Sequence, residues 1–275
     1  MVTPPTVPPR PTAADRDAAV ELRARQVSKR FPARRGGDPL LVLDHVDLDL
    51  RHGEFISIIG ASGCGKTTLL RVMAGLEPDF TGSVELGGRP VTSPGPDKGV
   101  VFQDHRLLPW LTVADNVGFG LLNRPAADRQ RVVEKYLRLV GLQNFARAYP
   151  GQLSGGMAQR AAIVRALVNK PRVLFLDEPL GALDALTRMH MQRELERVWR
   201  EERVTVLMVT HDVEEAIYLS DRVVVMGSRP GRVKKIIPIP VARPRSREHP
   251  DFLAIKKELL TTFSLEAREY FSYEI

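Results

Sequence analysis

The chain has almost no cysteine and no long apolar run, and each shortage excludes a class of protein. One cysteine, Cys64, among 275 residues excludes an internal disulfide and suits a reducing compartment. No run reaches the roughly 18 apolar residues that a transmembrane helix needs. The N-terminus carries prolines where a secretory leader has an apolar core. We therefore expect a cytoplasmic protein without membrane spans.

The charge balance is basic: 40 Lys and Arg against 33 Asp and Glu give a formal net charge of +7. Such a chain can favour nucleic acid or anionic lipid. No recognised nucleic-acid motif accompanies the charge, so we expect no nucleic-acid partner. The basic, proline-rich stretch from about Ser228 to Pro250 is interpreted as a solvated extension, in preference to a segment resting on anionic lipid.

The order of predicted elements indicates the fold class. Short apolar strands such as Phe55–Gly60 alternate with helical patterns such as 128–140, which predicts a largely parallel sheet covered on both faces. Pro238, one of three prolines near that position, argues against a central strand there. Residues 252–271 have a helical pattern again. At 275 residues the chain is long enough for one large domain with a substantial core.

A phosphate-binding loop follows the strand Phe55–Gly60. Residues Gly60–Thr67 read Gly-Ala-Ser-Gly-Cys-Gly-Lys-Thr and fit the P-loop pattern. Glycines allow backbone N–H groups to converge on phosphate oxygens, and the N-terminus of the following helix also favours anions. Lys66 is predicted to reach the β- and γ-phosphates, and the Thr67 hydroxyl to bind Mg²⁺. Cys64 is interpreted as a small loop residue whose modification would obstruct the phosphates.

Two carboxylates end a second apolar strand about 110 residues later. The run Val173–Glu178 reads Val-Leu-Phe-Leu-Asp-Glu. Asp177 suits a metal-holding role, and Glu178 could polarise an attacking water. Acidic strand ends are common in α/β proteins, so this cluster gains its meaning from the preceding P-loop.

A third element identifies the resemblance. Residues Leu153–Gly156 read Leu-Ser-Gly-Gly, lie between the P-loop and the acid cluster, and resemble the signature of ABC ATPases. Phe31 is similar to the aromatic residue that stacks on adenine in this family, and Gln103 to the Q-loop glutamine. Gly181–Asp184 resembles the D-loop, and His211 the switch histidine. Each piece alone would be uninformative, whereas the set in this order is specific.

The resemblance implies a fold and a domain layout. The fold is an α/β P-loop NTPase with a mostly parallel core sheet, an antiparallel β subdomain and a helical signature subdomain at about residues 104–165. The ATPase domain spans residues 21–240, after a disordered N-terminal extension at 1–20 and before a C-terminal helical tail at 241–275.

The resemblance also implies cofactors, site residues and partners. ATP and Mg²⁺ are the implied cofactors, hydrolysed by a homodimer in which the signature of one chain faces the P-loop of its twin. Transmembrane permease subunits and, indirectly, a solute-binding protein are the other partners. The implied catalytic residues are Lys66, Glu178 and His211, and the implied metal ligands are Thr67, Gln103 and Asp177. The implied nucleotide-binding residues are Phe31, Gly60, Ala61, Ser62, Gly63, Cys64, Gly65, Lys66, Thr67, Thr68, Gln103, Ser154, Gly155, Gly156 and Asp184.

One departure from the family pattern concerns the rate of dimer closure. Gln and a basic residue commonly follow the signature, and here Met157 and Ala158 stand in those places. Methionine cannot make a glutamine's hydrogen bonds. Phosphate contacts come from Ser154 and backbone groups, so we expect hydrolysis to survive.

The residues after Gln103 point to a branch of the family. Residues 102–110 and 115–120 resemble importers of nitrate, sulfonate and taurine, and residues 177–192 are most similar to aliphatic sulfonate import subunits. Sulfonate is the first expectation, with taurine, nitrate or another small anion as alternatives. Leu107, Leu108 and Trp110 are either core residues or an apolar surface for the permease.

Two rival functions are disfavoured. A soluble ABC ATPase acting on DNA would carry a long coiled-coil insertion between the P-loop and the acid cluster, and none is present here. A ribosome-acting member usually carries two ATPase units, whereas this sequence has one. A nucleotide-binding module without activity would lack the equivalents of Glu178 or His211, which are both present. We therefore expect a peripheral protein at the cytoplasmic face of the membrane that hydrolyses ATP to energise transport.

Overall fold

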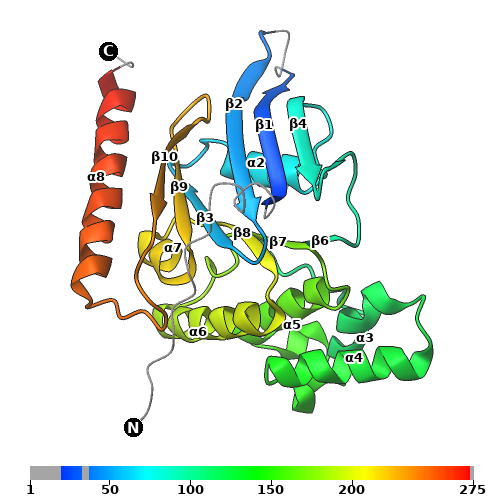
Figure 1. Cartoon of the computed structure of the whole chain (residues 1–275). Helices are drawn as coiled ribbons and strands as arrows, with labels where there is room; N and C mark the ends of the chain where they lie inside the picture. The colour runs from blue at the N-terminus through cyan, green and yellow to red at the C-terminus, as the bar shows by residue number, and fades with distance from the viewer. Residues whose placement is uncertain (1–19, 33–36, 273–275) are drawn as a thin grey trace.

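Two sheets and a group of helices build the fold (Figure 1). The computed structural model describes residues 20–32 and 37–272, with side chains described up to residue 262. The expected extension at residues 1–20 therefore lies almost wholly outside the described residues. The six-stranded sheet has the order β10-β9-β3-β8-β7-β6. Its strands are β3 (Phe55–Gly60), β6 (Lys98–Val101), β7 (Val173–Asp177), β8 (Thr205–Val209), β9 (Arg222–Met226) and β10 (Val233–Pro238).

The central strands are apolar because both of their faces are covered. Every residue of β3, β7 and β8 is buried, as expected for parallel strands between layers of helix. All neighbouring pairs are parallel except β10 with β9. Strand β10 lies at the edge of the sheet and ends at Pro238, where a missing N–H interrupts no central ladder.

The second sheet is antiparallel and covers one end of the first. Its strands are β2 (Leu40–Arg51), β1 (Val20–Phe31), β4 (Thr81–Leu86) and β5 (Arg89–Pro90), in that order. Alternating residues of β1 and β2 turn inward and pack with helix α2 (Lys66–Met73) in one apolar cluster. This packing places the antiparallel sheet directly beside the loop between β3 and α2.

Helices α3, α5, α6 and α7 are held at their N-termini by short polar side chains. Thr112, Ser154, Asp184 and Asp212 each accept a hydrogen bond from a backbone N–H three residues on. The helices are α3 (Val113–Gly118), α4 (Ala126–Leu139), α5 (Gly155–Leu167), α6 (Ala185–Glu202), α7 (Val213–Leu219) and α8 (Pro250–Ser272). Helices α3 to α5 project together on one side of the molecule (Figure 1). The expected fold class, with its parallel core, antiparallel subdomain and helical subdomain, is confirmed.

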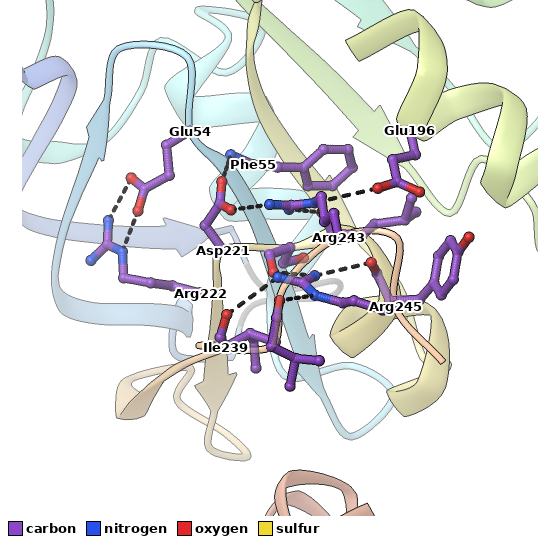
Figure 2. Close-up of polar contacts among 12 residues, drawn as sticks. Glu54, Phe55, Glu196, Asp221, Arg222, Ile239, Arg243 and Arg245 are labelled. Carbon is purple, nitrogen blue, oxygen red and sulfur yellow. Dashed lines mark hydrogen bonds and ion pairs between the residues drawn. The ribbon is translucent and has the colours of Figure 1, made fainter. Parts of the chain in front are cut away.

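The basic stretch before α8 is not the solvated extension that its composition suggested. Arg245 is 6% exposed and donates to the main-chain carbonyls of Ile217, Tyr218, Ser220, Ile239 and Val241 (Figure 2). Burial lowers the pKa of its guanidinium to about 10, so it stays charged at neutral pH. Arg243 pairs with Asp221 at 2.5 Å and lies over the Trp199 ring. The prediction was wrong because these guanidinium forks match carbonyls that α7 leaves unpaired at its C-terminus.

Helix α8 docks through one apolar face, which gives a stability prediction. Phe252 is fully buried, whereas its neighbour Leu253 is 50% exposed. Phe252→Ala should lower the free energy of opening of α8 by about 3 kcal/mol, because a buried ring is lost and a cavity remains. Native-state hydrogen exchange of the α8 amides measures this, with Leu253→Ala as the matched control. Equal effects of the two substitutions would contradict the packing described.

Candidate active site

A cavity of about 440 Å³ lies where β3 ends and α2 begins. It is bordered by three strand ends and by one residue of the antiparallel sheet. Its lining residues are Val42, Gly60, Ser62, Gly63, Gly65, Lys66, Thr67, Thr68, Glu178 and His211. Glu178 follows β7 and His211 follows β8, so the parallel sheet brings both to the loop that follows β3.

Two glycines of the loop have identifiable steric reasons. A Cβ on Gly60 would lie 2.7 Å from the carbonyl oxygen of Met226, so only glycine allows this close approach. Gly65 has a φ of 93° and stands before the first residue of α2. No side chain caps that helix. Its first N–H groups therefore remain available to an anion, as a phosphate-binding loop requires.

Lys66 and Thr67 occupy the first turn of α2. Lys66 is 7% exposed, and its ammonium donates to the carbonyls of Gly60 at 2.9 Å and Ala61 at 3.0 Å. The Thr67 hydroxyl donates to Asp177 Oδ1 at 2.8 Å. A buried cation and a hydroxyl–carboxylate pair thus stand side by side at the base of the cavity.

The Thr67–Asp177 pair fits a magnesium ion. Burial raises the pKa of Asp177, while the hydrogen bond from Thr67 opposes that shift. A divalent cation would compensate the buried carboxylate, and hydroxyl and carboxylate oxygens are ligands that Mg²⁺ prefers. Within the described residues, no group of three or more His, Cys, Asp or Glu side chains forms an all-protein metal cage.

Glu178 and His211 face each other across the cavity. Glu178 Oε2 lies 3.2 Å from His211 Nδ1. Glu178 also has a φ of 47°, which is unusual for a residue with a Cβ. Its backbone N–H donates to the Val209 carbonyl at 2.9 Å, which fixes it against β8. The arrangement presents a carboxylate and an imidazole to whatever occupies the loop.

Several predicted site residues lie outside this cavity. Gln103 is exposed on the segment after β6, and Ser154 and Asp184 are exposed at the N-termini of α5 and α6. Hydrogen bonding to the side chain of Thr187, and to its backbone N–H at 3.1 Å, lowers the pKa of the Asp184 carboxyl. Their assigned roles in nucleotide binding stay predictions, because none of these three residues lines the cavity.

Phe31 also lies outside the lining of the cavity. The Lys29 ammonium stands 4.7 Å from the centre of the Phe31 ring, and Lys29 is itself held by Glu77. One face of the ring is therefore covered, and adenine could stack only on the other. Val42 lines the cavity instead. It lies two residues after Leu40, which pairs with Phe31 in the antiparallel sheet.

Two residues near the loop, Val42 and Arg229, were not predicted from the sequence. The Arg229 guanidinium lies beside the loop, 2.9 Å from the place where a Cβ on Gly63 would stand. Val42 and Arg229 belong to no sequence motif, and only tertiary packing brings them to the loop.

Cys64 is 1% exposed and packs in the apolar cluster of the antiparallel sheet. It is therefore a poor target for the thiol reagent that its position in the loop suggested.

Comparison with known proteins identifies the family. The sequence model described as ABC transporter matches residues 43–181. The chain is 47% identical over 222 residues to the aliphatic sulfonates import ATP-binding protein SsuB of Bacillus subtilis, covering 81% of this chain and 87% of that protein. The chain belongs to the ABC transporter ATP-binding family. It is an ATPase that couples ATP hydrolysis to transport.

Other similarities agree with this assignment. The ABC ATPase is 46% identical over 256 residues to the bicarbonate transport ATP-binding protein CmpC of Synechococcus elongatus, covering 90% of this chain and 38% of that protein. A solved structure, described as a dimeric post-hydrolysis state of the ATP-binding cassette MJ0796 bound to ADP and Pi, superposes with a TM-score of 0.70 at 30% identity. That match covers 80% of this chain and 100% of the solved one. The described part of the ABC ATPase contains no helix that is long and apolar enough to cross a membrane.

A buried carboxyl beside the site generates a pH prediction. Burial raises the pKa of Glu215 to about 7, although the Thr210 hydroxyl donates to it. Because the folded pKa is above the unfolded one, the folded chain binds the extra proton, and stability falls as pH rises towards 7. The free energy of unfolding should drop by about 2 kcal/mol between about pH 5.5 and pH 8 from this group.

The measurement compares wild type with Glu215→Gln by urea unfolding at both pH values. The variant should lose about 2 kcal/mol of the difference between the two pH values, since glutamine does not titrate there. Lys257→Gln, an exposed substitution on α8, serves as the control. An unchanged pH dependence in Glu215→Gln would contradict the assignment.

Proposed function

We propose that two copies of this ABC ATPase bind two ATP molecules head to tail and hydrolyse them to drive an importer. The observation that carries the proposal is the cavity lined by the P-loop, Glu178 and His211, in which Thr67 is bonded to Asp177. The exposed Ser154 supports the dimer. It caps α5 and does not line the cavity of its own copy. In the dimer, Ser154 and the N-terminus of α5 would contact the phosphates bound in the partner's cavity.

The binding roles follow from the contacts already present. Lys66 exchanges its carbonyl partners for the β- and γ-phosphates, and the N–H groups at the start of α2 bind phosphate oxygens. Thr67 and Asp177, with Gln103 from the segment after β6, hold the metal. When bound, Mg²⁺ offsets the phosphate charge that develops during transfer.

Glu178 and His211 serve the chemical step. Glu178 accepts a proton from the attacking water and orients it towards the γ-phosphorus. His211 lies within hydrogen-bond distance of Glu178 and stabilises charge on the γ-phosphate together with Lys66. Met157 does not interfere with this chemistry, since its backbone N–H is bound to Ser154 and its side chain packs on the helical core.

One substitution tests both the catalytic role and the dimer. Glu178→Gln should reduce ATP turnover by about 10² or more while ATP still binds, because the amide accepts no proton. ATP that is bound and not hydrolysed should hold the copies together, so sedimentation should show a dimer with ATP and a monomer without. Near-normal turnover would remove Glu178 from its role. A monomer in saturating ATP would contradict the head-to-tail site.

The surface beside the Q-loop segment supports docking to a permease at the cytoplasmic face of the membrane. Leu107 is 7% exposed and belongs to the core, whereas Trp110 is 70%, Phe119 50% and Leu122 59% exposed. A groove of about 380 Å³, lined by residues that include Leu108 and Phe119, adjoins them. Exposed aromatic side chains next to an apolar groove are typical of an interface core.

The proposed solute is an aliphatic sulfonate, with taurine, nitrate, bicarbonate or another small anion as alternatives. SsuB and CmpC have nearly the same identity to this chain, at 47% and 46%, so similarity ranks them only weakly. In the proposed assembly the solute is selected by the permease and a separate binding protein. The solute therefore has to be assigned on the assembled transporter.

An uptake assay of the assembled transporter tests the coupling surface and the solute together. Trp110→Ala should reduce solute uptake by about 10-fold or more, as expected for a central aromatic anchor, while ATP turnover of the isolated subunit stays near wild type. Leu253→Ala, which removes an exposed apolar side chain on α8, should leave uptake unchanged. Normal uptake with Trp110→Ala would exclude this surface as the docking site. Uptake of bicarbonate without sulfonate would replace the proposed solute.

A further inference from the structure

The position of helix α7 decides where His211 lies. The helix has seven residues and begins two positions after His211. A helix of this length is not stable alone, so its place depends on tertiary contacts. The ring of His211 is 59% exposed, and its hydrogen-bond contact within the described part of the chain is with Glu178. Backbone geometry, and hence α7, must aim the ring.

A network of short bonds makes the His211 loop and α7 one unit. The Thr210 hydroxyl donates to buried Glu215 on α7 and accepts from the N–H of Asp212. Asp212 in turn caps α7 by accepting from the N–H of Glu215 at 3.0 Å. A shift or rotation of α7 therefore moves the loop that carries His211.

The C-terminal end of α7 is held by the segment that follows β10. Arg245 donates to the carbonyls of Ile217, Tyr218 and Ser220 at 2.7 to 2.9 Å, as Figure 2 shows for the cluster around it. Arg243 donates to the next carbonyl, that of Leu219, at 2.6 Å. Two cations thus meet the negative end of the helix dipole and satisfy its last carbonyls.

The N-terminal end of α7 is held by the same segment after it has crossed the helix. Glu214, in the first turn, pairs with Lys256 of α8 at 2.5 Å and with Arg247 at 3.7 Å. Arg247 also lies over the ring of Tyr218. The buried side of α8, which includes Phe252 and Ile255, packs in the core cluster that contains α7.

We propose that the segment 239–256 positions the switch histidine by gripping α7 at both ends through Arg243, Arg245, Arg247 and Lys256, with Arg245 as the main positioning residue. The inference rests on the proposed function, because it assumes that His211 acts in hydrolysis. It gives the C-terminal segment a part in catalysis, although the segment contributes no residue to the cavity. Loosening the grip leaves the P-loop intact and misplaces His211, so ATP binding persists while turnover falls.

The test measures ATP turnover and ATP affinity of the full chain with two kinds of variant. Arg245→Met keeps an unbranched apolar stem and removes the guanidinium, and should lower kcat about 5-fold with ATP affinity unchanged. Lys256→Gln, a milder surface change, should lower kcat about 2-fold. Lys257→Gln removes the same charge one residue away without touching α7 and is the matched control. Temperatures are kept well below the unfolding midpoint of each variant.

A double-mutant cycle separates positioning from general destabilisation. In a His211→Ala background, Arg245→Met and Lys256→Gln should lower kcat by less than about 1.5-fold, because the group they position is gone. Reductions as large as those in wild type would overturn the proposal, as would a loss of ATP affinity in place of turnover. Wild type that binds ATP without hydrolysing it would instead contradict the proposed function itself, before any variant is compared.

Discussion

The parallel arrangement of β3, β8 and β7 is the constraint on which the rest of this protein depends. Parallel strands direct their carboxyl ends to one edge of the sheet, and these three are neighbours in the order β3-β8-β7. The loop after β3, the acids after β7 and His211 after β8 must therefore meet. Burial makes that meeting rigid, since every residue of these three strands is buried between covering layers.

Charge in the site is arranged as the proposed binding of phosphates and Mg²⁺ would require. Lys66 is buried with carbonyls as its partners, Asp177 is buried with a hydroxyl as its partner, and the start of α2 has no side-chain cap. Lys66 has two carbonyl partners, Asp177 has one hydroxyl partner, and the proposed phosphates and Mg²⁺ would satisfy these groups better. The proposed nucleotide site is therefore preorganised, because its binding groups are already in position in the folded chain.

Arginine has a different task in the C-terminal half of the molecule. Arg243 and Arg245 bind main-chain carbonyls and nearby acids, and together they fasten the segment after β10 to the body of the domain. A guanidinium supplies five donors in a rigid fork, which lysine could not match at such a crowded position. The net positive charge of the chain is therefore partly internal, and a count of charges overstates the basic character of its surface.

The sequence determined the elements and the motifs, while tertiary structure decided which of them meet. Apolar runs such as Phe55–Gly60 predicted buried strands well, because continuous hydrophobicity follows directly from burial on both faces. The P-loop was equally clear, since its glycines answer to local backbone geometry. Val42 and Arg245 could not be predicted, because their contacts join residues far apart in sequence and depend on how α7, β10 and the antiparallel sheet pack. Ser154 and Gln103 remain in between: their motifs could be read locally, but neither residue lines the cavity of the folded chain, so their roles stay predictions.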